Sequence, residues 1–360
     1  MEHGSQDRPG SGEIRVSASV ASAPLNLKAL AHYLHAQGLS DGAPISAVAL
    51  AGGQSNPTFR LQAGPHRYVL RKKPDGLLLN GAHAVDREHR VIRALRDSDV
   101  PVPRAYAYCD DDTVIGTPFY IMEFLEGRVF EDQSLPAMQP VERRAIYREM
   151  ARVLATLHRV DPAAAGLQDY GKPGNYFARQ IARWSRQSKA SEVRVNDAMH
   201  RLMDWLPEHV PPDDRTTLVH GDYRLDNLVF HAQEPRVIGV LDWELSTLGH
   251  PMSDLAYQCM SWHVPPALWR GIGGLDLAAL GIPEEREYMT LYGAGADHVA
   301  AEHWDFYLAY SLFRMAAILY GIAARAAQGN AAAADAQDIG RRAGPLADLA
   351  WQRCEASIAR

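Results

Sequence analysis

Cysteine is scarce in this chain of 360 residues, with three at Cys109, Cys259 and Cys354. They stand far apart, so the close spacings of a metal site are missing, and they form no even disulfide set. A run of about 18 apolar residues is also missing, because the best candidate, residues 315–327, is interrupted by Arg325 and is too short to cross a bilayer. Residues 1–23 lack the apolar centre of a signal peptide. We therefore expect a cytoplasmic protein without a membrane span.

Excess positive charge is absent too, since 37 Lys and Arg residues stand against 43 Asp and Glu residues, for a formal net charge of -6. Nucleic-acid-binding domains are usually basic, so the composition gives no support to a nucleic-acid partner. The chain does have length and 47% hydrophobic residues, enough for a sizeable core. That length predicts two domains or one large two-lobed unit. The sequence does not indicate an oligomeric state.

Two polar motifs stand out. The first is HGD at residues 220–222, with Asn227 five residues after the aspartate; the second is LDWE at residues 241–244, after an apolar run. Phosphoryl transfer from ATP needs a carboxylate to orient and deprotonate the attacking hydroxyl, and an amide oxygen and a second carboxylate to hold magnesium. Asp222, Asn227 and Asp242 have these types, and the first two have the spacing of a kinase catalytic loop. Either motif alone suits a plain turn or strand end; both in this order favour a kinase.

The HGDxxxxN form resembles the aminoglycoside phosphotransferase and choline kinase-like family, the small-molecule relatives of protein kinases. The resemblance covers about residues 45 to 325, through GGQSNPTF, YVLRKKPDG, HGDYRLDN and LDWELSTLGHPMSDLA. The subgroup it is most similar to includes the phosphotransferase half of two-part acyl-CoA dehydrogenases. It implies an α+β, protein-kinase-like bilobal fold: a flexible tail at 1–23, a small antiparallel-sheet lobe at 24–125 and a mostly helical lobe at 126–360.

The resemblance also implies the cofactors ATP and Mg²⁺ in the cleft between the lobes, with Asp222 as the base and Asn227 and Asp242 as metal ligands. A phosphate cover is expected at Gly52, Gly53, Ser55 and Asn56. The hinge is expected at FYIMEFLEG, with Met122 behind the adenine and backbone groups of Glu123 and Leu125 at its edge.

The strand YVLRKK should carry the cation that holds the nucleotide phosphates. Neighbouring strand residues point to opposite faces, so either Arg71 or Lys72 faces the nucleotide, and we favour Arg71. Glu88, in a helix expected over 82–97, matches the glutamate that pairs with this cation in kinases. A solvated surface charge is the alternative for Glu88.

Other residues of the motifs have supporting roles in this interpretation. His220 is expected to orient the loop by hydrogen bonding, and Asp254 to accept the loop's backbone amides. Glu244 is a candidate for a second metal or an acceptor hydroxyl. Arg224 either meets a phosphate or the acceptor, or forms a plain ion pair within the loop. His158 is expected to cap the end of the helix that begins near residue 140.

Two departures from protein kinases indicate a small-molecule hydroxyl acceptor. Gly221 stands where a regulated protein kinase carries an arginine that reads a phosphorylated loop. Between Asp242 and Asp254 there are only eleven residues, too few for an activation loop on which a protein substrate lies. Phosphorylation of the loop is therefore not expected to control this protein.

The acceptor itself is less clear from the sequence. Residues 172–201 carry seven basic side chains, and Arg179 and Arg183 share one face of an expected helix. This face is either simply solvated or borders the acceptor site and favours an anionic compound such as a hydroxyacyl-CoA. Two alternatives remain: a nucleotide-binding protein without turnover, and a phosphotransferase of aminoglycoside antibiotics.

Overall fold

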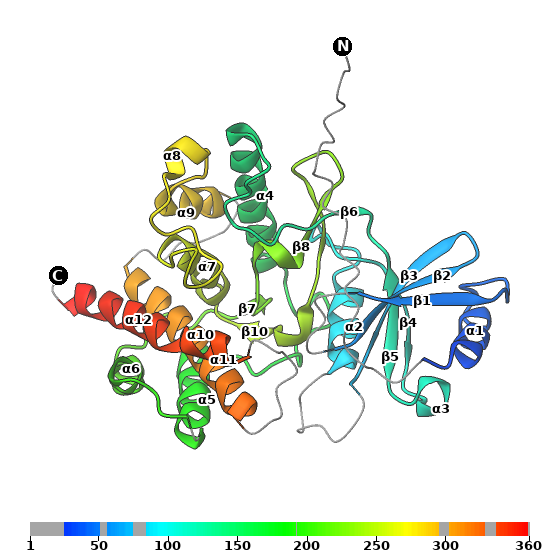
Figure 1. The fold of residues 1–360 in the computed structure, drawn as a ribbon, viewed down its shortest axis with the longest axis horizontal. Coiled ribbons are helices and arrows are strands. Elements are labelled where there is room, and N and C mark those ends of the chain that lie inside the picture. The colour runs from blue at the N-terminus through cyan, green and yellow to red at the C-terminus, as the bar shows by residue number, and fades with distance from the viewer. Residues whose placement is uncertain are drawn as a thin grey trace, which may run out of the picture.

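The computed structural model describes residues 25–50, 56–74, 84–191, 193–294, 302–327 and 336–358. These residues form two lobes, a small one built on a sheet and a large one that is mostly helical (Figure 1). The small lobe contains a five-stranded antiparallel sheet in the order β1-β2-β3-β5-β4. Its elements are α1 (Leu27–Ala36), β1 (Ile45–Ala49), β2 (Thr58–Ala63), β3 (His66–Lys72), α2 (Val85–Ala94), β4 (Ala105–Cys109), α3 (Asp112–Ile115) and β5 (Phe119–Glu123).

The two faces of this sheet have different neighbours, as strand alternation requires. On one face Leu70 and Ile121 join a core with Leu30 and Leu34 of α1. On the other face Val69 joins the core that continues into the large lobe. Arg71 lies two residues after Val69 and therefore shares the face that looks toward α2 and the large lobe.

The large lobe packs helices around two small sheets, β6-β8-β9 and β10-β7. Its helices are α4 (Pro140–His158), α5 (Tyr176–Ala190), α6 (Asp197–Glu208), α7 (Met252–Cys259), α8 (Leu277–Leu280), α9 (Glu285–Gly293), α10 (Trp304–Ala327), α11 (Ala336–Arg341) and α12 (Ala343–Ile358). Its strands are β6 (Gly127–Arg128), β7 (Thr217–Val219), β8 (Leu228–His231), β9 (Val237–Val240) and β10 (Thr247–Gly249), with single 3₁₀ turns η1 (Leu225–Asn227), η2 (Trp243–Leu245) and η3 (Met260–Trp262).

The start of α4 illustrates how local sequence sets a boundary. Pro140 occupies the first turn, where its missing N–H costs no hydrogen bond, and the Glu142 side chain accepts the N–H of Gln139 at 2.9 Å. The apolar stripe of this helix is buried as its spacing predicts, at Ile146, Met150, Val153, Leu154 and Leu157.

Two helix boundaries differ from those that the sequence pattern predicts. The pattern predicts a helix over residues 192–206, but α6 begins at Asp197, because the side chain of Asn196 caps it by accepting the N–H of Met199 at 3.0 Å. The pattern also predicts one helix over residues 331–358, but the described part, residues 336–358, is divided into α11 and α12 at Arg342.

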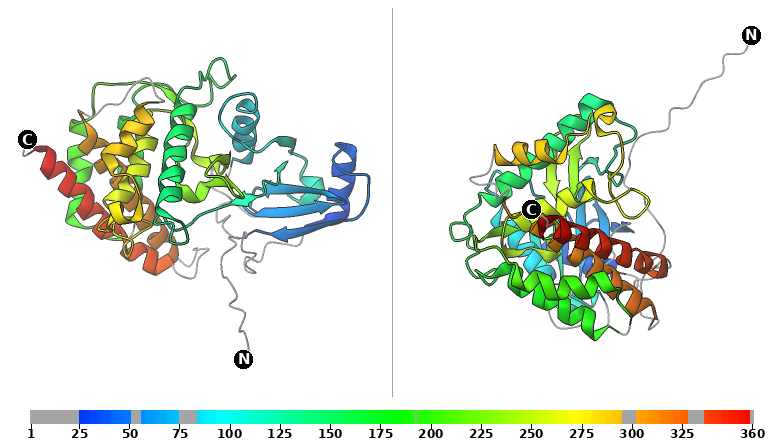
Figure 2. Two further views of the ribbon diagram at one scale, coloured as in Figure 1. Left: turned by 90° about the horizontal axis from the view of Figure 1, so that it is seen from above. Right: turned by 90° about the vertical axis from the view of Figure 1, so that its left-hand side faces the viewer.

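The longest described helix, α10, is a core element. Its 24 residues are long and apolar enough to cross a membrane by length and composition, which makes this stretch longer than the expected residues 315–327, but 78% of the apolar window is buried inside the protein. The helix packs against α5, α7 and α12 (Figure 2). A buried helix needs no polar face, which accounts for its continuous apolar sequence.

Candidate active site

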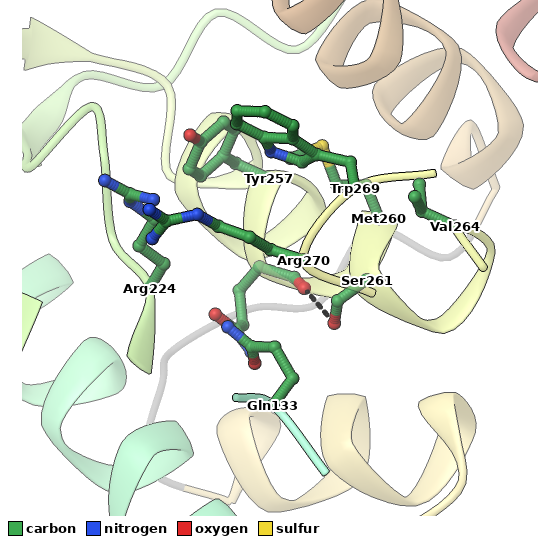
Figure 3. Close-up of a pocket in the computed structure, with 9 residues that line it drawn as sticks. Gln133, Arg224, Tyr257, Met260, Ser261, Val264, Trp269 and Arg270 are labelled. Carbon is green, nitrogen blue, oxygen red and sulfur yellow. Dashed lines mark hydrogen bonds between the residues drawn. The ribbon is translucent and has the colours of Figure 1, made fainter. Parts of the chain in front are cut away.

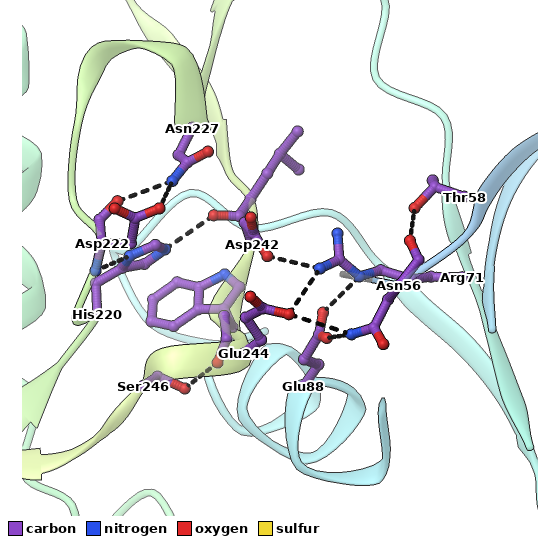
Figure 4. Close-up of polar contacts among 12 residues, drawn as sticks. Asn56, Thr58, Arg71, Glu88, His220, Asp222, Asn227, Asp242, Glu244 and Ser246 are labelled. Atoms are coloured by element: carbon purple, nitrogen blue, oxygen red, sulfur yellow. Dashed lines mark hydrogen bonds and ion pairs between the residues drawn. The ribbon is translucent and has the colours of Figure 1, made fainter. Parts of the chain in front are cut away.

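The segment after β7 turns sharply at Gly221 to form the catalytic loop. Gly221 has a φ of 82°, and an added Cβ would lie 2.6 Å from the carbonyl oxygen of Leu245. Only glycine meets both conditions without strain. The departure from the arginine of regulated protein kinases therefore has a steric cause in this fold. Beyond the turn, Asp222 and Asn227 lie together, with Nδ2 of Asn227 2.9 Å from Oδ2 of Asp222 (Figure 4).

Asp254 of α7 holds this loop in place by hydrogen bonds, as predicted. Its buried carboxylate accepts the backbone N–H of His220 at 2.6 Å and of Gly221 at 2.8 Å. Burial acts to raise the pKa of Asp254, but a hydrogen bond from His158 and the other donors outweigh it and hold the pKa below its ordinary value. The carboxylate is thus stabilised in its ionised form, which can accept both amides.

The prediction for His158 is wrong. Its ring is buried, with Nε2 3.3 Å from Asp254 and Nδ1 2.9 Å from the hydroxyl of Tyr292. The end of α4 points into the lobe rather than to solvent, so the histidine supports Asp254 instead of capping its own helix.

His220 connects the two motifs, in the orienting role predicted for it. Its Nδ1 accepts the N–H of Asp222 at 3.2 Å, and its Nε2 lies 2.8 Å from the carbonyl oxygen of Leu241. These partners assign the proton to Nε2, because a carbonyl oxygen can only accept. Trp243 packs on the same ring, with centroids 4.7 Å apart. The catalytic loop and LDWE are therefore held in one fixed relation.

Both oxygens of Asp222 have hydrogen-bond donors. Tyr257 of α7 donates its hydroxyl to Oδ1 at 2.6 Å, and Arg224 approaches Oδ2 with Nε at 3.2 Å, beside the amide of Asn227. Burial and the charge of Asp222 raise the pKa of Tyr257 far above its ordinary value, so the hydroxyl remains a donor. Sequence reasoning missed Tyr257, although its position three residues after Asp254 places it on the same side of α7.

Arg71 lies opposite this loop, among three carboxylates (Figure 4). Its guanidinium is 3.0 Å from Glu88, 2.6 Å from Asp242 and 3.7 Å from Glu244. Burial would lower the pKa of Arg71, but Glu88 and Asp242 outweigh it and raise the pKa. The alternative that Glu88 is a solvated surface charge is wrong, because this side chain is buried against Arg71.

Glu88 has two further donors within the small lobe. Asn56 donates from Nδ2 to Oε1 at 2.7 Å, and the hydroxyl of Tyr120 donates to Oε2 at 3.1 Å. Burial raises the pKa of Glu88, against the effect of Arg71. A buried charge of this kind is tolerated only when its oxygens are paired in this way.

The phosphate-binding predictions have mixed outcomes. Lys72 is buried and, by strand alternation, lies on the opposite face of β3 from Arg71, so Arg71 is the residue that reaches the cleft. Asn56 is buried, and its amide nitrogen lies 3.4 Å from Glu244 in addition to its hydrogen bond to Glu88. Its side chain therefore links these two carboxylates and does not face the solvent. Gly52, Gly53 and Ser55 lie outside the described residues.

Asn227 and Asp242 fit a magnesium ion. Both side-chain hydrogen bonds of Asn227 come from Nδ2, which leaves the amide Oδ1 as a ligand atom, and Asp242 uses Oδ1 for Arg71. Asp242 adopts a φ of 65°, a strained conformation of the kind that functional sites retain. Within the described ranges no three His, Cys, Asp or Glu side chains form a metal site by themselves. Nucleotide oxygens would complete the octahedral set that magnesium requires.

The predicted hinge lies at the end of β5. Met122 is buried in the core shared by the lobes. The N–H of Glu123 donates to the carbonyl oxygen of Arg104 at 2.8 Å, so only the carbonyl of Glu123 can serve an adenine edge. Leu125 packs on Gly239 of β9, where an added Cβ would lie 2.1 Å from its Cδ1.

Comparison with known proteins agrees with this geometry. The sequence model of the phosphotransferase enzyme family matches residues 46–292. The chain belongs to this phosphotransferase family. A crystal structure of a candidate aminoglycoside phosphotransferase from Ralstonia eutropha JMP134 is 52% identical, with a TM-score of 0.84, and covers 92% of this chain and 99% of that one.

The phosphotransferase is also similar to a much longer protein. It is 45% identical over 310 residues to acyl-CoA dehydrogenase family member 10 of Mus musculus, covering 86% of this chain but 29% of that protein. A thermostable variant of aminoglycoside phosphotransferase APH(4)-Ia, solved with ADP and hygromycin B, is 16% identical with a TM-score of 0.58 and covers 89% of this chain and 97% of that one. The last likeness supports the kinase-like fold alone.

The basic helix expected to border the acceptor is α5. Arg179 of α5 donates to the backbone carbonyls of Lys172 and Pro173, and the exposed Arg183 lies over the ring of Trp184 at 5.0 Å. These contacts in the described part of the chain do not include Asp222, Asn227 or Asp242, and the substrate role of Arg179 and Arg183 stays a prediction. Helical spacing identified their shared face but could not say what lies opposite it.

His250 makes folding of this phosphotransferase sensitive to acid. Its ring lies just before α7, where Nδ1 accepts the N–H of Met252 at 3.2 Å. Burial lowers the pKa of His250 to about 4, against the effect of Asp213 and with a smaller contribution from Arg215. In the unfolded chain the pKa of His250 has its ordinary value, so the unfolded chain binds a proton at this histidine more readily than the folded chain does. The contribution of neutral His250 to the free energy of unfolding is therefore fully present above about pH 6.5. It is lost as the pH drops toward 4, and the loss amounts to up to about 3 kcal/mol.

We expect the free energy of unfolding in urea to fall between pH 7 and pH 4.5 in the wild type. The loss should be smaller in His250→Asn, which keeps an acceptor for the N–H of Met252 but does not titrate. His200→Asn, at an exposed position of α6, is the matched control and should retain the wild-type loss. An equal pH dependence in all three proteins would contradict the role of His250.

Proposed function

We propose that this phosphotransferase is an ATP-dependent kinase of a small molecule, in which a hydroxyl group of the acceptor attacks the γ-phosphorus of Mg·ATP. One observation carries the proposal: Asp222 and Asn227 lie on one loop, and His220 links that loop through Leu241 to Asp242, which contacts Arg71 of the small lobe. The base, the metal ligands and the phosphate cation are thereby brought to the same place. ADP in the structure of APH(4)-Ia supports a nucleotide in this cleft.

Each residue has a distinct part in this reaction. Asp222 accepts the hydroxyl proton while the bond from the hydroxyl oxygen to phosphorus forms and the bond from phosphorus to ADP breaks. Arg71, positioned by Glu88, holds the phosphates of the nucleotide. Asn227 and Asp242 would hold magnesium, which neutralises negative charge on the phosphates when bound. Tyr257 and Asn227 keep the carboxylate of Asp222 in place, at 2.6 and 2.9 Å.

The short connection after Asp242 supports a small acceptor. The chain passes through η2 and β10 directly into α7, so Asp254 follows after one 3₁₀ turn and one three-residue strand. Protein kinases place their protein substrates on a long loop at this point. The connection here has no room for such a platform.

We further propose that the acceptor is an anionic hydroxy compound, for which a hydroxyacyl-CoA is the leading example. The name of the mouse relative supports acyl-CoA chemistry, because the matched part is a phosphotransferase within a protein named for acyl-CoA dehydrogenation. Aminoglycosides are polycations and require a site rich in carboxylates. The carboxylates near Asp222 are instead already paired with arginines.

The test is ADP release by purified protein with a panel of acceptors. We expect turnover with hydroxy acids or their CoA thioesters at a kcat/KM at least about tenfold above that for kanamycin. The loss of a single charge pair between protein and acceptor is enough to produce a difference of this size. Efficient phosphorylation of kanamycin would instead identify an antibiotic phosphotransferase. Tight binding of Mg·ATP without release of ADP for any acceptor would identify a nucleotide-binding protein without turnover.

A further inference from the structure

A pocket opens beside the loop that carries Asp222, where Arg224 and Tyr257 form part of its lining (Figure 3). It lies between the catalytic loop, the end of α7 and the segment that follows η3. Its main lining residues are Arg224, Tyr257, Met260, Val264, Trp269 and Arg270. Two of them contact Asp222 directly, since Tyr257 donates to Oδ1 at 2.6 Å and Arg224 approaches Oδ2 at 3.2 Å. A molecule in this pocket, here named the Trp269 pocket, would therefore present its atoms to the proposed base.

The charged groups around the Trp269 pocket are mainly positive. Arg224 and Arg270 converge on the same oxygen of Asp226, and Figure 3 shows their guanidinium groups directed toward each other. Arg314 lies over the ring of Tyr257 at 5.1 Å.

Two arginines lie over the ring of Trp269. Arg270 lies 5.8 Å and Arg342 5.7 Å from the ring centroid. Around the described lining residues, four arginines therefore stand against two carboxylates, Asp222 and Asp226. This excess of positive charge favours an anion and disfavours a polyamine.

One wall of the pocket is apolar. Met260 and Val264 in this wall are buried, and Trp269 is half-buried. Apolar side chains beside a few directed cations are the usual composition of a site that binds an organic anion. Arg270 is exposed at the mouth, with 42% of its side chain accessible, so a long ligand can continue past it into solvent.

We propose that the Trp269 pocket is the acceptor site, in which Arg270, with Arg224, binds an anionic group while Trp269 contacts the aliphatic segment that carries the reacting hydroxyl. The proposal rests on the proposed function and specifies where and how that acceptor is recognised. The anionic group is either the carboxylate of a free hydroxy acid or a phosphate of a CoA thioester. Both are bound by guanidinium groups, whose planar fork matches two oxygens at once.

The first test measures binding, without turnover. Calorimetry with 3-hydroxybutyryl-CoA and with 3-hydroxybutyrate, in the presence of AMP-PNP and Mg²⁺, is applied to the wild type, Arg270→Glu, Trp269→Ala and the control Arg201→Glu. Arg201 matches Arg270 in being exposed beside a tryptophan, but it lies on α6. We expect Arg270→Glu to weaken binding of the tighter probe by about ten- to a hundredfold, and Arg201→Glu to leave it unchanged.

The second test separates this proposal from the proposed function. Steady-state kinetics on the same proteins should show a raised KM for the acceptor in Arg270→Glu and Trp269→Ala, with the KM for ATP unchanged. Wild-type turnover together with unaltered acceptor binding and KM in both pocket variants would overturn the pocket and leave the kinase intact. Acceptor binding that Arg270→Glu abolishes, without turnover in the wild type, would support the pocket and count against the kinase. Failure of both probes to bind the wild type would count against an anionic acceptor in this pocket.

Discussion

Replacement of Asp222 by alanine is expected to lower kcat by about 10²–10⁴-fold, the usual contribution of a general base. The carboxylate is oriented from three sides, by Tyr257, Asn227 and Arg224, and none of these donors can accept the proton of a hydroxyl acceptor. Affinity for Mg·ATP should remain close to that of the wild type, because the proposed metal ligands and Arg71 are retained.

The measurement combines ADP release with calorimetric titration of Mg·ATP. Asp222→Asn, which keeps the size of the side chain, should lose nearly as much activity as the alanine variant. Asp204→Asn removes an exposed carboxylate on α6 and serves as the control. A decrease of only a few-fold in Asp222→Ala would rule out the proposed role as base.

Replacement of Asp242 by asparagine is expected to abolish the part of ATP affinity that depends on magnesium. The carboxylate of Asp242 supplies negative charge to the proposed metal site beside the neutral amide of Asn227, and magnesium prefers charged oxygen ligands. Asparagine suits this position better than alanine, because Asp242 has a φ of 65° and asparagine tolerates the left-handed region. Asparagine also keeps an oxygen to accept the hydrogen bond from Arg71.

ATP titrations with and without Mg²⁺ test this prediction. The wild type should bind Mg·ATP more tightly than free ATP, and Asp242→Asn should bind the two about equally. Asp204→Asn again serves as the control. If magnesium strengthened ATP binding equally in the wild type and in Asp242→Asn, the metal role of Asp242 would be falsified.

Much of the fold and part of the site could be predicted because they depend on short-range patterns. The interval from Asp222 to Asn227 is five residues of one loop, so this spacing can be recognised without knowledge of the rest of the fold. Arg71 was favoured over Lys72 from the resemblance and the alternation of a strand. The pairing of Arg71 with Glu88, and the bracing of His220 by Asp254, followed from the family resemblance and are present in the structure.

The residues around the Trp269 pocket were not predictable in the same way. Arg270 is separated from Asp226 by more than forty positions, yet the two form an ion pair. Arg314 lies more than ninety positions from Gly221, whose carbonyl oxygen it contacts. Arg179 and Arg183 formed a clear helical pattern, but the residues opposite α5 could not be inferred from that pattern.

By itself, the sequence determined the family, the kinase-like fold and the candidate for the catalytic carboxylate, because each depends on residue types at fixed local spacing. The tertiary structure alone decided which charges meet. It turned Asn56 toward Glu88, brought Tyr257 to Asp222 and placed Arg270 and Trp269 in one pocket with Tyr257. The physical reason is that a buried charge must find partners wherever the folded chain brings them, and helical or strand periodicity describes only one element at a time.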